Sequence, residues 1–249
     1  GNTEALAVSS EQLKRMNEMR VLTIAMMSMS SVSGAIVGAY VQMVPGELVL
    51  TAIPLNIVNA IIVSCLLNPV SVEEKEDIIY SLKNNEVERQ PFFSFLGDSV
   101  LAAGKLVLIT IAFVISFAAL ADLFDRFINL ITGLIAGWIG IKGSFGLNQI
   151  LGVFMYPFAL LLGLPYDEAW LVAQQMAKKI VTNEFVVMGE ISKDIASYTP
   201  HHRAVITTFL ISFANFSTIG MIIGTLKGIV DKKTSDFVSK YVPMMLLSG

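Results

Sequence analysis

Long uncharged stretches alternate with short polar connections along the whole chain. Five of these stretches run over 21–46, 48–72, 106–141, 143–166 and 204–226, and only the third is interrupted by charged residues. A helix needs about 20 apolar residues to cross the roughly 30 Å hydrocarbon layer of a bilayer. Because a buried soluble core does not need runs this long, the pattern predicts a polytopic, all-α membrane protein.

The composition agrees with a membrane protein. Of the 249 residues, 54% are hydrophobic and 15% are charged, whereas about 25% are charged in a typical soluble domain. The mean hydropathy is +0.68, and a net charge of −3 without a basic face excludes a nucleic-acid partner. A single cysteine, Cys65, lies within an apolar run, which excludes an internal disulfide framework.

Two of the predicted spans carry polar residues at their centres. The segment 26–34 contains four serines and a glycine, and the segment 212–220 contains Asn215, Ser217 and Thr218. Hydroxyl and amide groups are costly in hydrocarbon unless they have hydrogen-bond partners. For either span taken alone, hydrogen bonds within the helix or to a neighbouring helix are the simpler explanation.

The two polar spans belong to a pattern that occurs twice. Each ends in a similar glycine-flanked segment, 34–38 or 220–224, and each follows a charged turn. An isolated glutamate precedes each turn, Glu4 in the first copy and Glu184 in the second. Interrupted helices in corresponding positions of two repeats are typical of secondary-transporter substrate sites. Backbone groups freed at such a break need a cavity, an ion or a polar solute.

The segment 167–199 predicts a re-entrant helical hairpin with Glu184 near its tip. Each limb is too short and too polar to cross a bilayer alone, although an interfacial amphipathic helix is the alternative. Lys179 is expected to neighbour Glu184 at this tip, because pairing lowers the cost of burying both charges.

These features predict eight segments in chain order. They are the C-terminal limb of a first re-entrant hairpin (1–20), a broken helix with the following transmembrane helix (21–72), a polar connection (73–94), a long transmembrane helix suited to scaffold or oligomer contacts (95–141), an interfacial or membrane helix (142–166), the second re-entrant hairpin (167–199), the second broken helix (200–230) and the start of a truncated last helix (231–249).

The sequence gives little support for a metal site or for an ATP-binding site. His201 and His202 have no Cys or acidic pair at ligand spacing, so we expect interfacial surface residues and no metal site. No phosphate-binding Gly-x-x-x-x-Gly-Lys motif occurs, so uphill movement would depend on an ion gradient. Two alternatives to transport remain: a membrane-embedded enzyme using Glu184 and Lys179 as acid and base, and a structural or channel-type helical bundle.

Three motifs resemble signatures of the concentrative nucleoside transporter family. Residues 179–186, Lys-Ile-Val-Thr-Asn-Glu-Phe-Val, resemble the family's Gly/Ala-x-Lys-x-x-x-Asn-Glu-Phe-Val-Ala pattern, with Val187 in place of Ala. Residues 213–220, Phe-Ala-Asn-Phe-Ser-Thr-Ile-Gly, look like the family's Phe-Ala-Asn-Phe-Ser-Ser/Thr-Ile-Gly. Residues 1–4 are similar to Gly-Gln-Ser/Thr-Glu, with Asn2 in place of Gln. The order and extent of the matches look closest to the bacterial nucleoside permease branch.

The resemblance implies a fold of inverted repeats, in which two hairpins and two broken helices meet around the solute. It implies a homotrimer in the bacterial plasma (inner) membrane, and it implies that this chain corresponds to the C-terminal part of the fold. The implied activity is nucleoside import coupled to Na⁺ or H⁺, without an enzymatic step, a further cofactor or a nucleic-acid partner. The residues leave the coupling ion and the choice between purine and pyrimidine open.

Motif positions also imply the site residues. The substrate-binding set comprises Asn2, Thr3 and Glu4 at the nucleobase, Ile36 against its plane, Glu184, Asn215 and Thr218 at the ribose hydroxyls, and Phe213 in the same pocket. Ser31 and Val32 correspond to the family's cation-binding pair, whereas Glu4 or Glu184 would carry the coupling proton if the transporter uses H⁺. A carboxylate suits ribose because it accepts from both vicinal hydroxyls.

Overall fold

The computed structural model describes residues 1–72, 91–139 and 145–249. Most of the polar connection predicted at 73–94 therefore lies outside the described residues. Within the described ranges the regular secondary structure is entirely helical. The predicted all-α fold is confirmed.

Two helices are interrupted at the same level of the molecule. The first break, residues 29–33, separates α3 (Glu18–Ser28) from α4 (Gly34–Tyr40). The second break, residues 212–215, separates α10 (Pro200–Ile211) from α11 (Phe216–Ile229). The breaks contact each other, because the Phe213 N–H donates to the Met29 carbonyl at 2.9 Å. We call the level of the two breaks the midplane.

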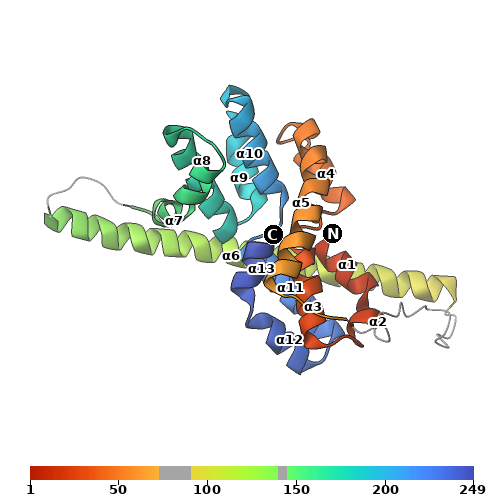
Figure 1. Ribbon diagram of the computed structural model, residues 1–249. Coiled ribbons are helices and arrows are strands. Elements are labelled where there is room, and N and C mark those ends of the chain that lie inside the picture. Colours follow the sequence, from red (N-terminus) through yellow and green to blue (C-terminus); the bar gives the residue numbers. More distant parts are fainter. Residues whose placement is uncertain (73–90, 140–144) are drawn as a thin grey trace.

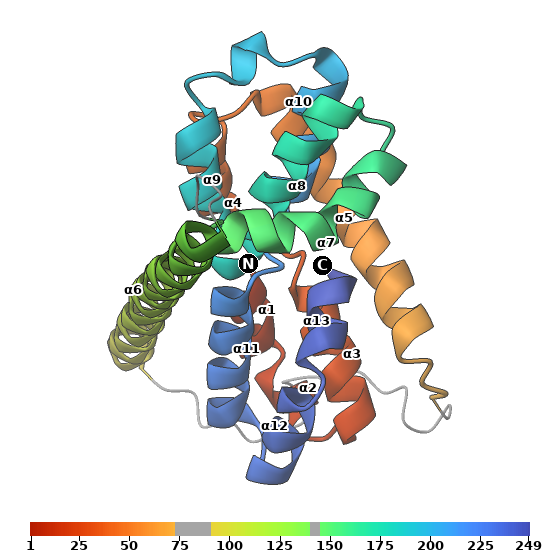
Figure 2. The ribbon, with the colours of Figure 1, turned by 90° about the vertical axis from the view of Figure 1, so that its left-hand side faces the viewer.

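The helices gather in two groups on either side of the midplane, and both termini lie near it (Figure 1). One group contains α4, α8 (Tyr166–Val181), α9 (Glu184–Ile191) and α10. The other group contains α1 (Asn2–Val8), α2 (Ser10–Leu13), α3, α11, α12 (Lys232–Ser239) and α13 (Val242–Ser248). Each group encloses its own hydrophobic core, so each broken helix packs one half into each core. Figure 2 shows α5 (Gly46–Leu67) running along both groups.

Asparagine side chains start two helices at the midplane. Asn183 Oδ1 accepts from the Val186 N–H at 3.1 Å, and Asn215 Oδ1 accepts from the Thr218 N–H at 2.8 Å. Such caps satisfy backbone donors that the first turn of a helix leaves without partners. As a result, Glu184 and Thr218 lie in the first turns of α9 and α11.

The segment predicted as a hairpin forms two antiparallel limbs. Helix α8 ends at Val181, the chain turns at Thr182, and α9 begins directly after the capping Asn183. An ion pair between Lys178 of α8 and Glu190 of α9 joins the two limbs. Helix α8 also packs along α7 (Leu147–Leu161), which leaves the turn directed toward the midplane (Figure 2).

Within the described residues, two helical stretches combine the length and apolar composition needed for a membrane span. They are Gly46–Leu67 and Pro200–Ile229, fewer than the five stretches expected. The first break divides the 21–46 stretch, just as the second break divides Pro200–Ile229, and α7, with 15 residues, reaches only about 22 Å. The first break falls in the segment predicted to hold a broken helix, and α7 falls in the segment predicted as an interfacial or membrane helix.

Helix α6 (Phe92–Ile139) is continuous over 48 residues, which corresponds to about 72 Å. It extends well beyond both groups of helices (Figure 1). Large apolar side chains along it, including Phe127, Leu130 and Trp138, are exposed. Exposed apolar surface of this extent is typical of contact with lipid or with another protein chain.

One histidine departs from the expected surface position. His201 is exposed, and its Nε2 lies 2.8 Å from the Leu162 carbonyl oxygen. His202 is buried instead, stacked on Tyr198 with ring centroids 4.1 Å apart, and its Nδ1 lies 3.5 Å from a Glu168 oxygen. The expected surface position of His202 was wrong, because α10 turns this residue toward the hairpin and away from water.

Candidate functional site

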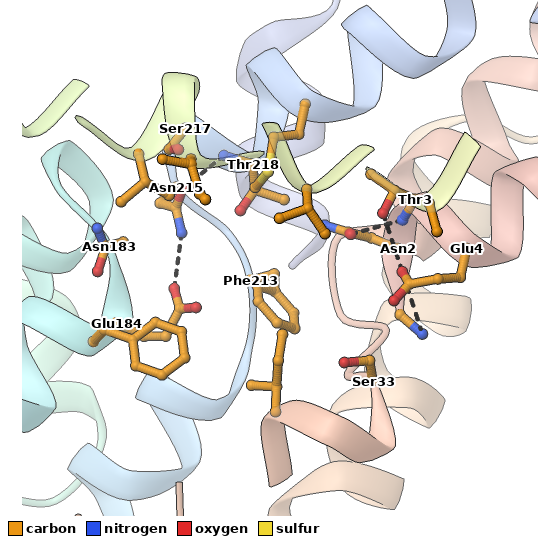
Figure 3. A pocket seen from close by; sticks show the side chains of 18 residues that line it. Asn2, Thr3, Glu4, Ser33, Asn183, Glu184, Phe213, Asn215, Ser217 and Thr218 are labelled. Atoms are coloured by element: carbon orange, nitrogen blue, oxygen red, sulfur yellow. Dashed lines mark hydrogen bonds and ion pairs between the residues drawn. The ribbon is translucent and has the colours of Figure 1, made fainter. Parts of the chain in front are cut away.

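A cavity of about 380 Å³ lies between the two groups of helices, within the roughly 300–1,000 Å³ typical of small-molecule sites. Its wall combines residues from α1, α4, α6, α9, the second break and α11 (Figure 3). All eight residues predicted to bind substrate line this cavity: Asn2, Thr3, Glu4, Ile36, Glu184, Phe213, Asn215 and Thr218. The structure therefore brings together every member of the predicted substrate set.

The acid at the hairpin tip is buried and strongly hydrogen-bonded. Glu184 is 2% exposed, and its Oε2 accepts from Asn215 Nδ2 at 3.0 Å. Its Oε1 accepts from the Tyr40 hydroxyl, also at 3.0 Å. A carboxylate offers about four acceptor positions over its two oxygens. Both Glu184 oxygens therefore keep acceptor capacity for a ligand in the cavity.

A fully buried lysine provides the positive charge nearest to this acid. Lys179 Nζ donates to Ser212 Oγ at 2.7 Å and lies 4.5 Å from the centre of the Phe209 ring. The ammonium and the Glu184 carboxylate interact electrostatically. Among the described residues the two groups form no ion pair within 4 Å; the ammonium is hydrogen-bonded to the second break and is absent from the cavity wall. An acid–base pair acting on a ligand would require both groups to face the cavity.

The other acid, Glu4, reaches the cavity from α1 on the opposite side of Phe213 (Figure 3). Its side chain is 58% exposed, whereas Glu184 is buried. The reason is helical spacing, because Asn2 and Leu6 share the buried face of α1 and leave Glu4 on another face. Thr3 Oγ1 donates to Glu4 Oε2 at 3.0 Å.

Two polar atoms in the cavity wall have no hydrogen-bond partner among the described residues. They are Asn2 Nδ2 and Ser217 Oγ, on side chains that are 7% and 1% exposed. A buried polar group without a partner costs about 1–3 kcal/mol. The two atoms therefore indicate a cavity built for a polar ligand.

The predicted cation pair lies in the first break and outside the cavity wall. Ser31 and Val32 are half-buried, and the Ser31 N–H donates to the Ser28 carbonyl at 3.1 Å. The described residues contain no group of His, Cys, Asp and Glu side chains arranged for a metal ion. A cation here would use hydroxyl and backbone carbonyl oxygens, which are the donors that unwound transporter helices present to Na⁺.

The sequence analysis did not predict several residues of the cavity wall. Ser217 and Asn183 lie inside two of the quoted motifs, so their polar side chains were available as a signal. The α6 wall carries no motif, although its residues repeat at helical spacing, which places them on one face of the helix. That wall consists of Ala103, Val107, Ile111 and Val114. Tyr40, which holds Glu184 from outside the wall, is also part of no motif.

Comparisons with known proteins agree on one relationship. The sequence profile described as "Na+ dependent nucleoside transporter C-terminus" matches residues 48–249. The purine nucleoside transport protein NupG of Bacillus subtilis is 45% identical over 249 residues, covering all of this chain and 60% of NupG. Sodium/nucleoside cotransporter 1 of Homo sapiens is 27% identical over 237 residues, covering 88% of this chain and 35% of that protein.

Solved structures give the same result. The structure of CNTnw in an inward-facing substrate-bound state superposes with a TM-score of 0.75 at 26% identity, covering 100% of this chain and 59% of CNTnw. The chain thus spans about 60% of the length of NupG and of CNTnw.

Proposed function

The chain belongs to the Na⁺-dependent nucleoside transporter family, and we propose that it forms the nucleoside-binding part of a cation-coupled importer. The relatives are membrane transporters and not enzymes, which removes the enzymatic alternative. Transporters also account for a cavity between two broken helices, which a purely structural bundle does not require.

The ribose is proposed to bind at the hairpin tip and the second break. Glu184 would accept hydrogen bonds from the vicinal hydroxyls, using the acceptor positions that Tyr40 and Asn215 leave open. Asn215 and Thr218 complete the polar side of the cavity. The observation that carries this proposal is a buried carboxylate facing a cavity whose wall also contains buried polar atoms without a hydrogen-bond partner in the described part of the chain.

The nucleobase is proposed to lie toward α1. Asn2, Thr3 and Glu4 present an amide, a hydroxyl and a carboxylate, which together match the donors and acceptors of a base edge. Ile36 and Phe213 supply apolar surface for the base plane. We propose purine nucleosides as the preferred substrates, because the 45% identical NupG is a purine nucleoside transport protein.

Sodium is the proposed coupling ion. The family description names Na⁺ dependence, and the oxygens of Ser31 and Val32 at the first break are suitable ligands. A proton carried by Glu4 or Glu184 is the competing possibility. The two are separated by measuring uptake under a Na⁺ gradient and under a proton gradient independently.

Assembly and location are proposed from the same relationship. We place the protein in the bacterial plasma (inner) membrane, as a homotrimer with multiple spans per chain. The long exposed apolar surface of α6 supports contacts with lipid or with neighbouring subunits.

The test is nucleoside uptake by proteoliposomes. The protein would be expressed with any segments that flank this sequence in its gene, and labelled inosine and uridine would be supplied under each gradient. We expect inosine uptake driven by Na⁺. Glu184→Gln should weaken nucleoside binding roughly 10- to 150-fold, because a hydrogen bond to a charged group contributes about 1.5–3 kcal/mol.

A matched control is available on the same helix. Glu190 of α9 is 55% exposed and pairs with Lys178 away from the cavity, so Glu190→Gln should leave nucleoside binding unchanged. Absence of uptake of either nucleoside under both gradients would refute the proposed function. Uptake that survives Glu184→Gln at wild-type affinity would refute the ribose assignment.

A further inference from the structure

Tyr40 lies directly behind the proposed ribose-binding acid. It is the last residue of α4 and is completely buried. Its ring packs between Phe185 and Phe213, with centroid distances of 5.2 and 6.5 Å. Both phenylalanines line the cavity, whereas Tyr40 does not. Tyr40 therefore supports the cavity wall from outside and is not placed to contact a ligand.

The Tyr40 hydroxyl has one function that its ring does not. It donates to Glu184 Oε1 at 3.0 Å across 144 residues of sequence. A buried tyrosine hydroxyl normally needs such a partner, and hydrogen bonds to an ionised acceptor are stronger than those between neutral groups. The ring fills space that phenylalanine would fill equally well, so the hydroxyl acts specifically on the orientation of the carboxylate.

Glu184 is consequently held from both repeats at once. Tyr40 of the first broken helix occupies a position on Oε1, and Asn215 of the second broken helix occupies a position on Oε2. A carboxylate offers about four acceptor positions, so capacity remains beside the bonds from Tyr40, Asn215 and the Glu184 backbone N–H. A ribose hydroxyl can donate to such a position. Rotation of the carboxylate would break one of the two side-chain bonds, so together they fix the direction of the free positions.

We propose that the Tyr40 hydroxyl is a positioning group that presents Glu184 to the ribose and links that acid to the first broken helix. This inference rests on the proposed function of the cavity. Tyr40 acts through Glu184 and makes no contact with the nucleoside. It thereby extends the recognition site to a residue outside the cavity wall.

The position of Tyr40 also connects the acid with the proposed cation site. Helix α4 begins at Gly34, directly after the break that holds Ser31 and Val32, and its seven residues end at Tyr40, a length of about 10 Å. A cation that orders the break would thus also order the helix carrying the hydroxyl. Because coupling between two binding sites is reciprocal, nucleoside bound at Glu184 would strengthen cation binding through the same helix.

The experiment compares Tyr40→Phe with wild type in equilibrium nucleoside binding, using the protein expressed with its flanking segments. The ligands are inosine and its 2′,3′-dideoxy analogue, each titrated with and without the cation that drives wild-type uptake. We expect about tenfold weaker inosine binding in the variant. The loss for the dideoxy analogue should be several times smaller, because that analogue lacks the hydroxyls that Glu184 would accept. The factor by which the cation strengthens inosine binding should fall toward one.

Two further variants separate positioning from general stability. In a Glu184→Gln background, Tyr40→Phe should cause no additional loss, because the positioned carboxylate is already gone. Tyr156→Phe removes the hydroxyl that contacts the Tyr166 carbonyl at 3.4 Å, away from the cavity, and should change neither ligand's affinity.

The possible results are distinct. Equal losses for inosine and the dideoxy analogue, losses that add to those of Glu184→Gln, or an unchanged Tyr40→Phe protein would each overturn the positioning role. Wild type that binds no nucleoside with any cation would instead overturn the proposed function, and the positioning role with it.

Discussion

Replacing Lys179 by methionine tests whether the buried acid depends on its lysine for charge compensation. The side chains are similar in length, and Lys179 has no exposed surface, so the substitution mainly removes the ammonium. The hydrogen bond to Ser212 is lost, and Glu184 keeps uncharged donors such as Tyr40 and Asn215. The variant therefore leaves a buried carboxylate without its neighbouring positive charge.

The expected magnitude follows from the cost of an uncompensated buried charge. Removing one partner of a buried charge pair costs about 3–5 kcal/mol, whereas replacing both partners by uncharged groups is often neutral. For domains of 150–250 residues, 1 kcal/mol changes the melting temperature by about 2–4 °C. We therefore expect Lys179→Met to melt about 6–20 °C below wild type. The double variant Lys179→Met/Glu184→Gln should regain most of that difference.

The assay is a double-mutant cycle on protein purified in detergent, with thermal unfolding followed by circular dichroism. Wild type, the two single variants and the double variant are compared at one detergent concentration and one pH. A Lys179→Met protein that melts within about 2 °C of wild type would refute the reasoning. So would a double variant whose loss equals the sum of the two single losses, because the two charges would then act independently.

Two further predictions concern helix packing and helix capping. A Cβ on Gly220 would lie 2.7 Å from the Phe113 ring, whereas one on Gly224 would lie 3.5 Å from it. Gly220→Ala should therefore destabilise the α6–α11 contact by about 1–3 kcal/mol, and Gly224→Ala should not; equal melting temperatures for the two variants would contradict this. Asn215→Ser keeps an α11 cap but loses the amide that donates to Glu184. Its free energy of unfolding should stay within about 1 kcal/mol of wild type, while inosine binding weakens about tenfold; unchanged binding would contradict the role of the amide.

The sequence alone predicted many residues of the cavity wall. The acid-bearing motif and the Phe-Ala-Asn motif predicted Glu184, Phe213 and Asn215, and the structure places all three around one cavity. The same motifs contain the asparagines that cap α9 and α11. Caps and apolar runs are recognisable from sequence because they depend on residues within about four positions along the chain.

Long-range partners could not be predicted in the same way. In the sequence, Tyr40 lies in an apolar stretch and belongs to no motif. It reaches Glu184 only because the two helix breaks contact each other in the folded protein. The α6 residues of the cavity wall could not be predicted for the same reason. Helical periodicity shows that they share a face of the helix, but not which part of the protein that face covers. The sequence also did not decide which polar side chains are buried, as the exposed Glu4 and the buried His202 show.

The sequence by itself determined that this protein is an all-α member of a transporter family, where its helices break and that Glu184 belongs to a shared polar site, which the structure shows as a cavity. The tertiary structure decided how that acid is held, with Tyr40 from one repeat, Asn215 from the other and Lys179 nearby. The physical reason is the range of the interactions. Helix formation and capping are local, whereas a buried carboxylate takes its donors and its compensating charge from whichever elements pack around it.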